Sequence, residues 1–125
     1  MKIHESAENY LETILILSQR NGSVRSIDIA SELGFSKPSV SIAMKNLREN
    51  GYIAVDNAGY ITLLAKGQEI AETIYERHTM LCDWLVALGV DKKTAAEDAC
   101  RIEHVISAES FQAIKEHTKN LNVIK

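Results

Sequence analysis

The chain has 125 residues, of which 46% are hydrophobic and 25% charged, and its formal net charge is −3. This composition excludes a disordered chain and is ordinary for one or two small domains that bury a core. No apolar run approaches the roughly 18 residues of a membrane span. The first residues lack the apolar region of a signal peptide, so we expect a cytoplasmic protein without a membrane partner, whose two cysteines are reduced thiols.

Helical periodicity predicts two helices at the start of the chain. The first extends from a capping residue, Ser6, to a stop at Asn21. The second covers Arg25–Leu33 and ends at Gly34, where a tight turn requires a positive φ. A glycine-containing turn that leads from this helix into a third one is typical of the helix-turn-helix motif.

The third helix is predicted to follow Ser36, a natural N-cap, with Pro38 in its first turn and Asn50 at its end. Its inward face is apolar and consists of Val40, Ala43, Met44 and Leu47. Its outward face combines short hydroxyls with cations, which can approach base edges and phosphates. The predicted DNA-binding residues are therefore Ser36, Lys37, Pro38, Ser39, Ser41 and Lys45.

Two short strands, Tyr52–Val55 and Tyr60–Leu63, are predicted to follow around a turn. Three helices and a hairpin predict a winged helix-turn-helix DNA-binding domain over residues 1–64. Residues 1–66 carry seven basic and seven acidic side chains, so this half of the chain is electrically balanced. The alternative is a winged-helix protein-interaction module, which is disfavoured because the outward face of the third helix lacks large apolar anchors.

A helical second domain is predicted over residues 65–125. Its first helix covers 65–88 and carries an apolar stripe that includes His78 and reaches Leu88. Within such a stripe, His78 is either a packed core histidine, bonded through one nitrogen, or a metal ligand. Gly89 ends this helix.

Two further helices complete the predicted second domain. Asp91 can cap the first of them, and Ser107 can cap the last, which reaches Leu121 before a frayed end at 122–125. The apolar residues are too many for these helices to cover: Trp84, Leu85, Leu88, Val90, Ala95, Ala96, Ala99 and Ile102. We expect self-association about a two-fold axis, the alternative being a core formed under the last helix.

Three potential metal donors lie close together in the sequence of the second domain. Cys100, Glu103 and His104 are spaced i, i+3 and i+4, so their side chains share one face of a helix. Thiolate, carboxylate and imidazole together suit a divalent transition metal. The alternative is a helix with a buried cysteine, a surface glutamate and a hydrogen-bonded histidine.

An enzyme is a further alternative for the same donors. A metallohydrolase could use Cys100 and His104 as ligands and Glu103 to activate water. The sequence shows no substrate-positioning loop or glycine-rich cradle, and every donor lies on a predicted helix of a small, mainly α core. We therefore do not expect an enzyme.

Four stretches of the chain together carry a family resemblance: Glu8–Ile14, Ser36–Ser41, Arg77–His78 and Ala99–Ser107. In this order they resemble the metal-dependent transcriptional repressors of the diphtheria toxin repressor and manganese transport regulator family. Together they span nearly the whole chain. Any one stretch is a weak signal, but the four in this order, with the Cys-x-x-Glu-His form, are specific. The resemblance implies a mainly α protein with a winged helix-turn-helix followed by an α-helical metal-binding and dimerisation domain, in the short two-domain form.

The resemblance also implies a set of metal ligands, namely Glu12, His78, Cys100, Glu103 and His104. Asn9 falls on a further ligand position, where manganese-responsive members carry aspartate and iron-responsive members methionine. At the ancillary metal site of the family, Cys82 replaces a glutamate and Ala96 replaces a histidine. We therefore expect this second site to be lost or altered.

These observations predict a metal-activated repressor of metal homeostasis genes that binds a double-stranded DNA operator. It would act as a homodimer joined through its C-terminal helices. Fe(II) is favoured over Mn(II), because the thiolate of Cys100 prefers iron, whereas manganese is better served by carboxylate oxygens and Asn9 adds no negative charge. The alternatives are a Mn(II)-responsive regulator of the same family and a metal-independent winged-helix regulator in which His78 and His104 are core residues.

Overall fold

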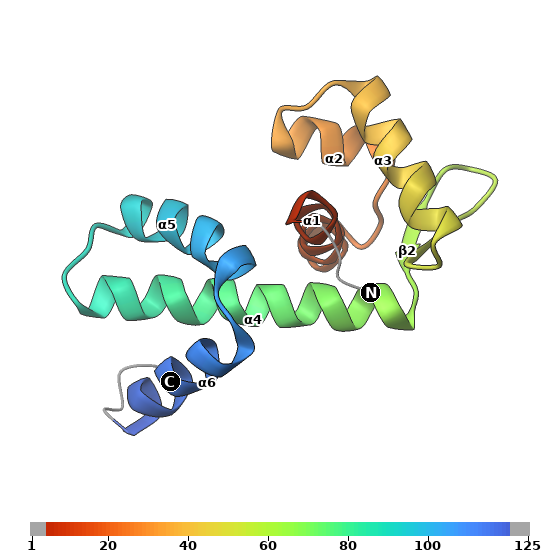
Figure 1. The fold of residues 1–125 in the computed structure, drawn as a ribbon. Helices are drawn as coiled ribbons and strands as arrows, with labels where there is room; N and C mark the ends of the chain where they lie inside the picture. Colours follow the sequence, from red (N-terminus) through yellow and green to blue (C-terminus); the bar gives the residue numbers. More distant parts are fainter. Residues whose placement is uncertain (1–4, 121–125) are drawn as a thin grey trace. The chain divides into compact units, whose positions relative to one another are not determined.

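The computed structural model describes residues 5–120, which form six helices and one two-stranded sheet (Figure 1). In chain order the elements are α1 (Glu5–Asn21), α2 (Ser26–Leu33), α3 (Lys37–Glu49), β1 (Ile53–Val55), β2 (Ile61–Leu63), α4 (Ala65–Ala87), α5 (Lys92–Val105) and α6 (Ala108–Asn120). The chain divides into two compact units, Met1–Glu72 and Thr73–Lys125, so the two ends of α4 belong to different units. The predicted fold class, a winged helix-turn-helix followed by helices, is confirmed.

The first helix begins earlier than predicted. Ser6 lies inside α1 and is not its cap, because the helix already includes Glu5. Two acidic residues, Glu5 and Glu8, occupy the first turn. Their negative charge is favourable at this end of a helix, where the unpaired backbone N–H groups carry partial positive charge.

The turn between α2 and α3 has the predicted helix-turn-helix chemistry. Arg25 is the N-cap of α2, and its backbone N–H donates to Asp28 Oδ2 at 2.9 Å, so the helix itself starts one residue later than predicted. Gly34 follows the helix with φ 71°, a conformation that costs glycine little. The Ser36 hydroxyl then accepts from the backbone N–H of Ser39 at 3.3 Å and caps α3. Both predicted signals are confirmed.

The hairpin is held to the helices by contacts that the sequence pattern does not reveal. Strands β1 and β2 are antiparallel, with Ile53 opposite Leu63. An isolated bridge joins Arg25 to Tyr60, and the N–H of Ile61 donates to the carbonyl of Val24 at 2.8 Å. The hairpin is therefore attached to the segment that starts α2 and forms a wing on the helix-turn-helix.

One apolar core joins all elements of the first unit. Its fully buried members include Leu11 and Ile14 of α1, Ile29 of α2 and Val40 of α3. The predicted inward stripe of α3 is confirmed, since Met44 and Leu47 are also buried and Ala43 packs against the cluster. Gly67 of α4 closes this core, and a Cβ atom placed on it would overlap the backbone carbonyl of Tyr52.

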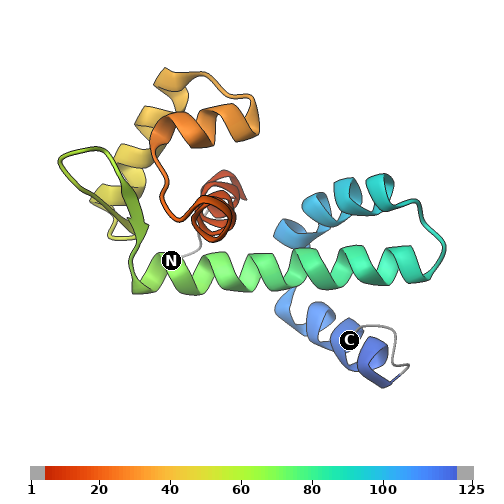
Figure 2. The same cartoon turned by 180° about the vertical axis from the view of Figure 1, so that it is seen from behind.

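In the second unit, α5 and α6 lie along opposite sides of the second half of α4, as both views show (Figures 1 and 2). Asp91 Oδ2 accepts from the N–H groups of Lys93 and Thr94 and caps α5, as predicted. Ser107 Oγ accepts from the N–H of Ser110 at 3.0 Å at the start of α6. The predicted end of this last helix at Leu121 and the predicted frayed end at 122–125 lie outside the described residues.

The second unit buries few large apolar side chains and exposes several. Ile74, Leu81 and Phe111 are buried. The predicted end of α4 at Leu88 is one residue too late, because the helix ends at Ala87. Leu88, one of the apolar residues that these helices were expected to leave uncovered, is 64% exposed. Among the described residues, no helix combines the length and the apolar content that a membrane span requires.

Candidate functional site

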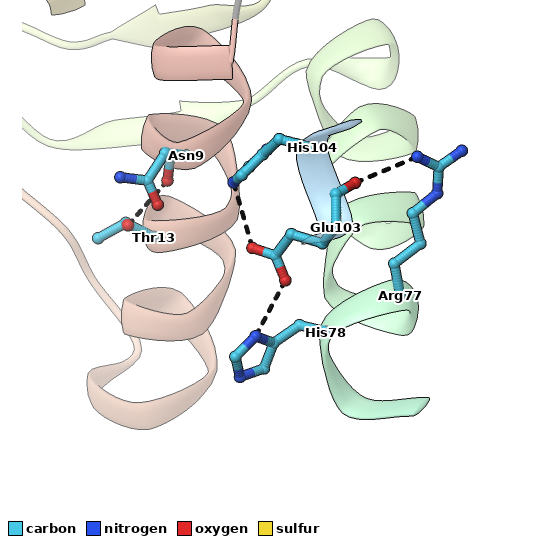
Figure 3. Close-up of polar contacts among 6 residues, drawn as sticks. All are labelled: Asn9, Thr13, Arg77, His78, Glu103 and His104. Carbon is cyan, nitrogen blue, oxygen red and sulfur yellow. Dashed lines mark hydrogen bonds and ion pairs between the residues drawn. The ribbon is translucent and has the colours of Figure 1, made fainter. Parts of the chain in front are cut away.

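The second unit brings together a carboxylate and two imidazoles. His78 of α4 and the consecutive residues Glu103 and His104 of α5 form this cluster (Figure 3). Glu103 Oε2 lies 2.9 Å from His78 Nδ1, and Glu103 Oε1 lies 3.2 Å from His104 Nε2. The Glu103 side chain is fully buried and that of His104 is 2% exposed. The carboxylate therefore lies between two ring nitrogens.

Arg77, next to His78, holds the C-terminal end of α5 against α4. Its Nη1 donates to the backbone carbonyl of Glu103 at 3.2 Å (Figure 3). The same atom donates to the backbone carbonyl of Ile106 at 3.1 Å. Its guanidinium also lies 5.6 Å from the centre of the Phe111 ring. The last carbonyls of a helix lack intrahelical partners, so a cation that donates to them stabilises the helix end. Arg77 thereby fixes the turn of α5 that presents Glu103 and His104.

Sequence reasoning did not assign this role to Arg77, which entered the family resemblance only as half of an Arg-His pair. Its partners lie 26 and 29 residues further along the chain, so no local pattern could have identified them. One signal was available in the sequence: Arg77 lies on the helix that carries the apolar stripe. A cation that packs near such a stripe needs hydrogen-bond acceptors, which points to a structural role.

The donors of this cluster fit a divalent metal ion. A buried carboxylate is costly unless its charge is balanced. Imidazole nitrogens and carboxylate oxygens are ordinary ligands of iron, manganese and zinc. Glu103 and His104 are adjacent on α5, and the packing of α5 against α4 brings the Glu103 carboxylate to His78. With a metal bound, both histidines would be neutral ligands.

The remaining predicted ligands lie at other places in the chain. Cys100 is on α5, one turn before Glu103, and its side chain is exposed. Asn9 and Glu12 lie on α1 in the first unit, where the Asn9 backbone carbonyl accepts from Thr13 Oγ1 at 2.8 Å (Figure 3). Glu12 is buried and Asn9 half-buried. Their roles as ligands stay predictions.

The predicted DNA-binding residues all lie at the start and on the outside of α3. Each of the six is solvent-exposed: Ser36, Lys37, Pro38, Ser39, Ser41 and Lys45. The hydroxyl of Ser36 already makes two hydrogen bonds within the protein. It donates to Ser39 Oγ at 2.8 Å, and it caps the helix by accepting from the Ser39 N–H. The side chains that are more available to a partner than that of Ser36 are therefore those of Lys37, Ser41 and Lys45.

A winged helix-turn-helix, joined to helices that carry a carboxylate–imidazole cluster, defines the class of DNA-binding transcriptional regulators that contain a metal-binding domain. The comparison with protein families identifies the particular family. Residues 2–60 match the N-terminal DNA-binding domain of the iron-dependent repressors, and residues 64–123 match their metal-binding and dimerisation domain. The chain therefore belongs to the iron-dependent repressor family.

Individual relatives agree with this assignment. An uncharacterised HTH-type transcriptional regulator of Methanocaldococcus jannaschii is 35% identical over 113 residues, which cover 89% of this chain and 90% of the relative. The transcriptional regulator MntR of Escherichia coli O157:H7 is 33% identical over 115 residues, covering 92% of this chain and 74% of MntR. The solved structure of the manganese regulator SloR is 28% identical with a TM-score of 0.79. It covers all of this chain, which spans 56% of the SloR chain.

The family assignment confirms several predictions made from the sequence. The chain is a metal-dependent transcriptional regulator that binds DNA, and it is not an enzyme. Its C-terminal half is a metal-binding and dimerisation domain. The preference for iron over manganese stays a prediction, because the relatives include a manganese regulator.

Proposed function

We propose that the protein is a repressor of metal homeostasis genes that binds a double-stranded DNA operator as a homodimer once a divalent metal is bound. The observation that carries this proposal is the buried carboxylate of Glu103 between His78 and His104, in a domain whose family binds metal. Exposed apolar side chains on the second unit, Val86, Leu88 and Val105, support self-association through its helices. We assign DNA binding to residues 1–64 and metal binding and dimerisation to 65–125, in the cytoplasm.

The proposed metal ligands are Glu12, His78, Cys100, Glu103 and His104, with Asn9 as a further position. Their assignment rests on the family resemblance and, for His78, Glu103 and His104, on the cluster they form in the second unit. We propose that the ancillary site is lost or altered, because Cys82 and Ala96 replace two of its residues. Bound metal would supply positive charge that neutralises the carboxylates.

Activation is proposed to work by linkage between metal and DNA binding. A ligand shifts a conformational equilibrium only by its differential affinity for the two states. The proposed ligand set includes residues of both units, so metal would favour the conformation that assembles all donors. Coupling free energies of about 1–3 kcal/mol are typical of such effects. DNA would in turn raise the affinity for metal by the same factor.

Operator binding measured at controlled free metal concentration tests this function. DNA binding by the metal-free protein is expected to be weak, to rise when Fe(II) or Mn(II) is added anaerobically, and to fall again when a chelator is added. DNA binding that is insensitive to the chelator would instead favour a metal-independent regulator, in which His78 and His104 serve only as core residues.

The physiological metal is proposed to be Fe(II). We predict that Cys100 and Asn9 set the preference for Fe(II) over Mn(II). Replacing Cys100 by Glu and Asn9 by Asp is expected to raise the response to Mn(II) relative to Fe(II), because two hard anionic oxygens are gained and a soft thiolate is lost. Anaerobic titration of operator binding with each metal, for wild type and the double variant, measures the ratio. Cys100→Ser, which removes the thiolate without adding charge, serves as the matched variant and should weaken the Fe(II) response.

Mn(II) is the second candidate, because a relative that matches along the whole chain is named a manganese regulator. If the wild-type protein responds to Mn(II) at a lower free concentration than to Fe(II), the assignment to iron is wrong. The binding affinity for each metal does not by itself identify the physiological metal, because Zn(II) binds such donors more tightly than Fe(II) or Mn(II).

We propose that the DNA-binding residues are Ser36, Lys37, Pro38, Ser39, Ser41 and Lys45, at the start and on the outside of α3, with Lys45 on a phosphate. Lys45→Ala is expected to weaken binding to all sequences and to lower the slope of log K against log salt by about one, since each neutralised phosphate contributes roughly 0.9. The measurement is DNA affinity as a function of salt. Lys92→Ala, which removes an exposed cation from α5, should leave the slope unchanged. A loss confined to one base position would make Lys45 a base reader.

A further inference from the structure

The outer face of α3 carries one large apolar side chain, Ile42. It is 63% exposed, more than any other large hydrophobic residue in the described part of the first unit. The expectation that this face lacks large apolar groups is therefore wrong at this position. Single exposed apolar residues are common on protein surfaces, so the surroundings of Ile42 decide what it means.

Ile42 lies at the centre of the outward face. Successive helical residues are rotated by about 100°, so Ile42 lies about 200° from the buried Val40, on the opposite side of the helix. Its neighbours one turn before and after are all exposed: Pro38, Ser39, Lys45 and Asn46. An aliphatic side chain is thus surrounded by small, polar and cationic groups on a helix that is proposed to meet DNA.

The composition of this face favours a nucleic acid over a protein partner. Protein interfaces rely on a central cluster of aromatic or large apolar anchors, whereas here Ile42 stands alone among exposed side chains. Lys37, Lys45 and Arg48 are exposed on the same helix and would attract phosphates. The occupant that fits both features is the major groove of DNA.

Within the major groove, one base offers an apolar group. The other edges present hydrogen-bond donors and acceptors, whereas thymine adds its C5-methyl group. A branched aliphatic side chain cannot donate or accept a hydrogen bond, so it gains binding energy only against that methyl. We infer that Ile42 is a sequence-reading residue of this protein that packs against the 5-methyl group of a thymine. This inference rests on the proposed DNA binding by α3.

The test removes the methyl group from the DNA and the side chain from the protein. The probe is a duplex that the full-length, metal-loaded wild-type protein selects from a randomised pool. Each thymine of this duplex is replaced in turn by deoxyuridine, which differs only by the methyl. At one or two positions per half-site, the wild-type affinity is expected to fall about fourfold, the ratio that corresponds to burial of one methyl group.

The variant Ile42→Ala is expected to bind more weakly and to lose this sensitivity, so that thymine and deoxyuridine duplexes bind equally at those positions. Ile27→Ala, which shortens an isoleucine that is 52% exposed on α2, should retain the full methyl effect. Because both side chains are exposed, both variants should keep the wild-type unfolding temperature, which is measured in parallel.

Three results would overturn the inference. The methyl effect could persist unchanged in Ile42→Ala, it could be lost in Ile27→Ala instead, or no thymine of the selected duplex could respond to loss of its methyl group. If the wild-type protein selects no sequence at all, the proposed function itself fails, and this outcome is distinct from the other three.

Discussion

Removal of His104 is expected to abolish the activation of DNA binding by metal. The His104 ring meets Glu103 at 3.2 Å, and both side chains are buried, so a surface side chain of α5 cannot replace the lost imidazole. Loss of a residue that only supports a metal ligand costs about 10–100-fold in metal affinity, and loss of a ligand should cost at least as much. In His104→Ala, metal should therefore no longer activate DNA binding, even at concentrations about tenfold above those that saturate the wild type.

Glu103→Gln tests the same site without changing its shape. Glutamine has nearly the same shape and can still hydrogen-bond to His78, so the fold should be retained, but the negative charge that attracts a cation is lost. Metal activation should fail while the helical circular dichroism and the oligomeric state stay those of wild type. Arg101→Ala, on the exposed side of the same helix, is the control and should respond to metal normally. Unchanged activation in His104→Ala would by itself contradict the metal-site assignment.

Gly67→Ala is expected to destabilise the first unit strongly. Inside a helix, exchange of glycine for alanine normally stabilises by up to about 1 kcal/mol. Here the added Cβ would overlap the backbone carbonyl of Tyr52, which cannot move away as a flexible side chain could. That carbonyl also accepts the N–H of Leu64 at 3.0 Å. We expect the free energy of unfolding to fall by about 1–3 kcal/mol, the range for overpacking of a well-packed core.

Urea denaturation of the full chain measures the change in the free energy of unfolding. A decrease supports the overlap with Tyr52, whereas an increase contradicts it. Gly89→Ala is not an adequate control, because Gly89 has a φ of 104° and any side chain is strained there. Thr79→Ala, at an exposed position of the same helix, is the better control, because it raises helix propensity without adding an atom to the core and should stabilise slightly. Stabilisation of Gly67→Ala would show that α4 is free to shift away from the hairpin.

The sequence by itself determined the order of the helices, three of their caps and the kind of protein. Ser36, Asp91 and Ser107 cap the helices that their positions predicted, and Gly34 adopts the left-handed turn. Such signals act through side chains that bond the backbone within a few residues, so a short stretch contains all the information. The Cys-x-x-Glu-His pattern and the outward polar face of α3 likewise indicated a metal-dependent DNA-binding regulator, which the family comparison confirmed.

Only the tertiary structure decided which of these side chains meet. Glu103 lies between His78 and His104 because α5 packs against α4, and Arg77 fixes that packing through carbonyls 26 and 29 residues away. Local periodicity ended α4 one residue late and overlooked Ile42, since a helical stripe does not show where a helix ends or which face another element covers. Contacts between distant segments depend on how whole helices pack, and this is information that no window of a few residues contains.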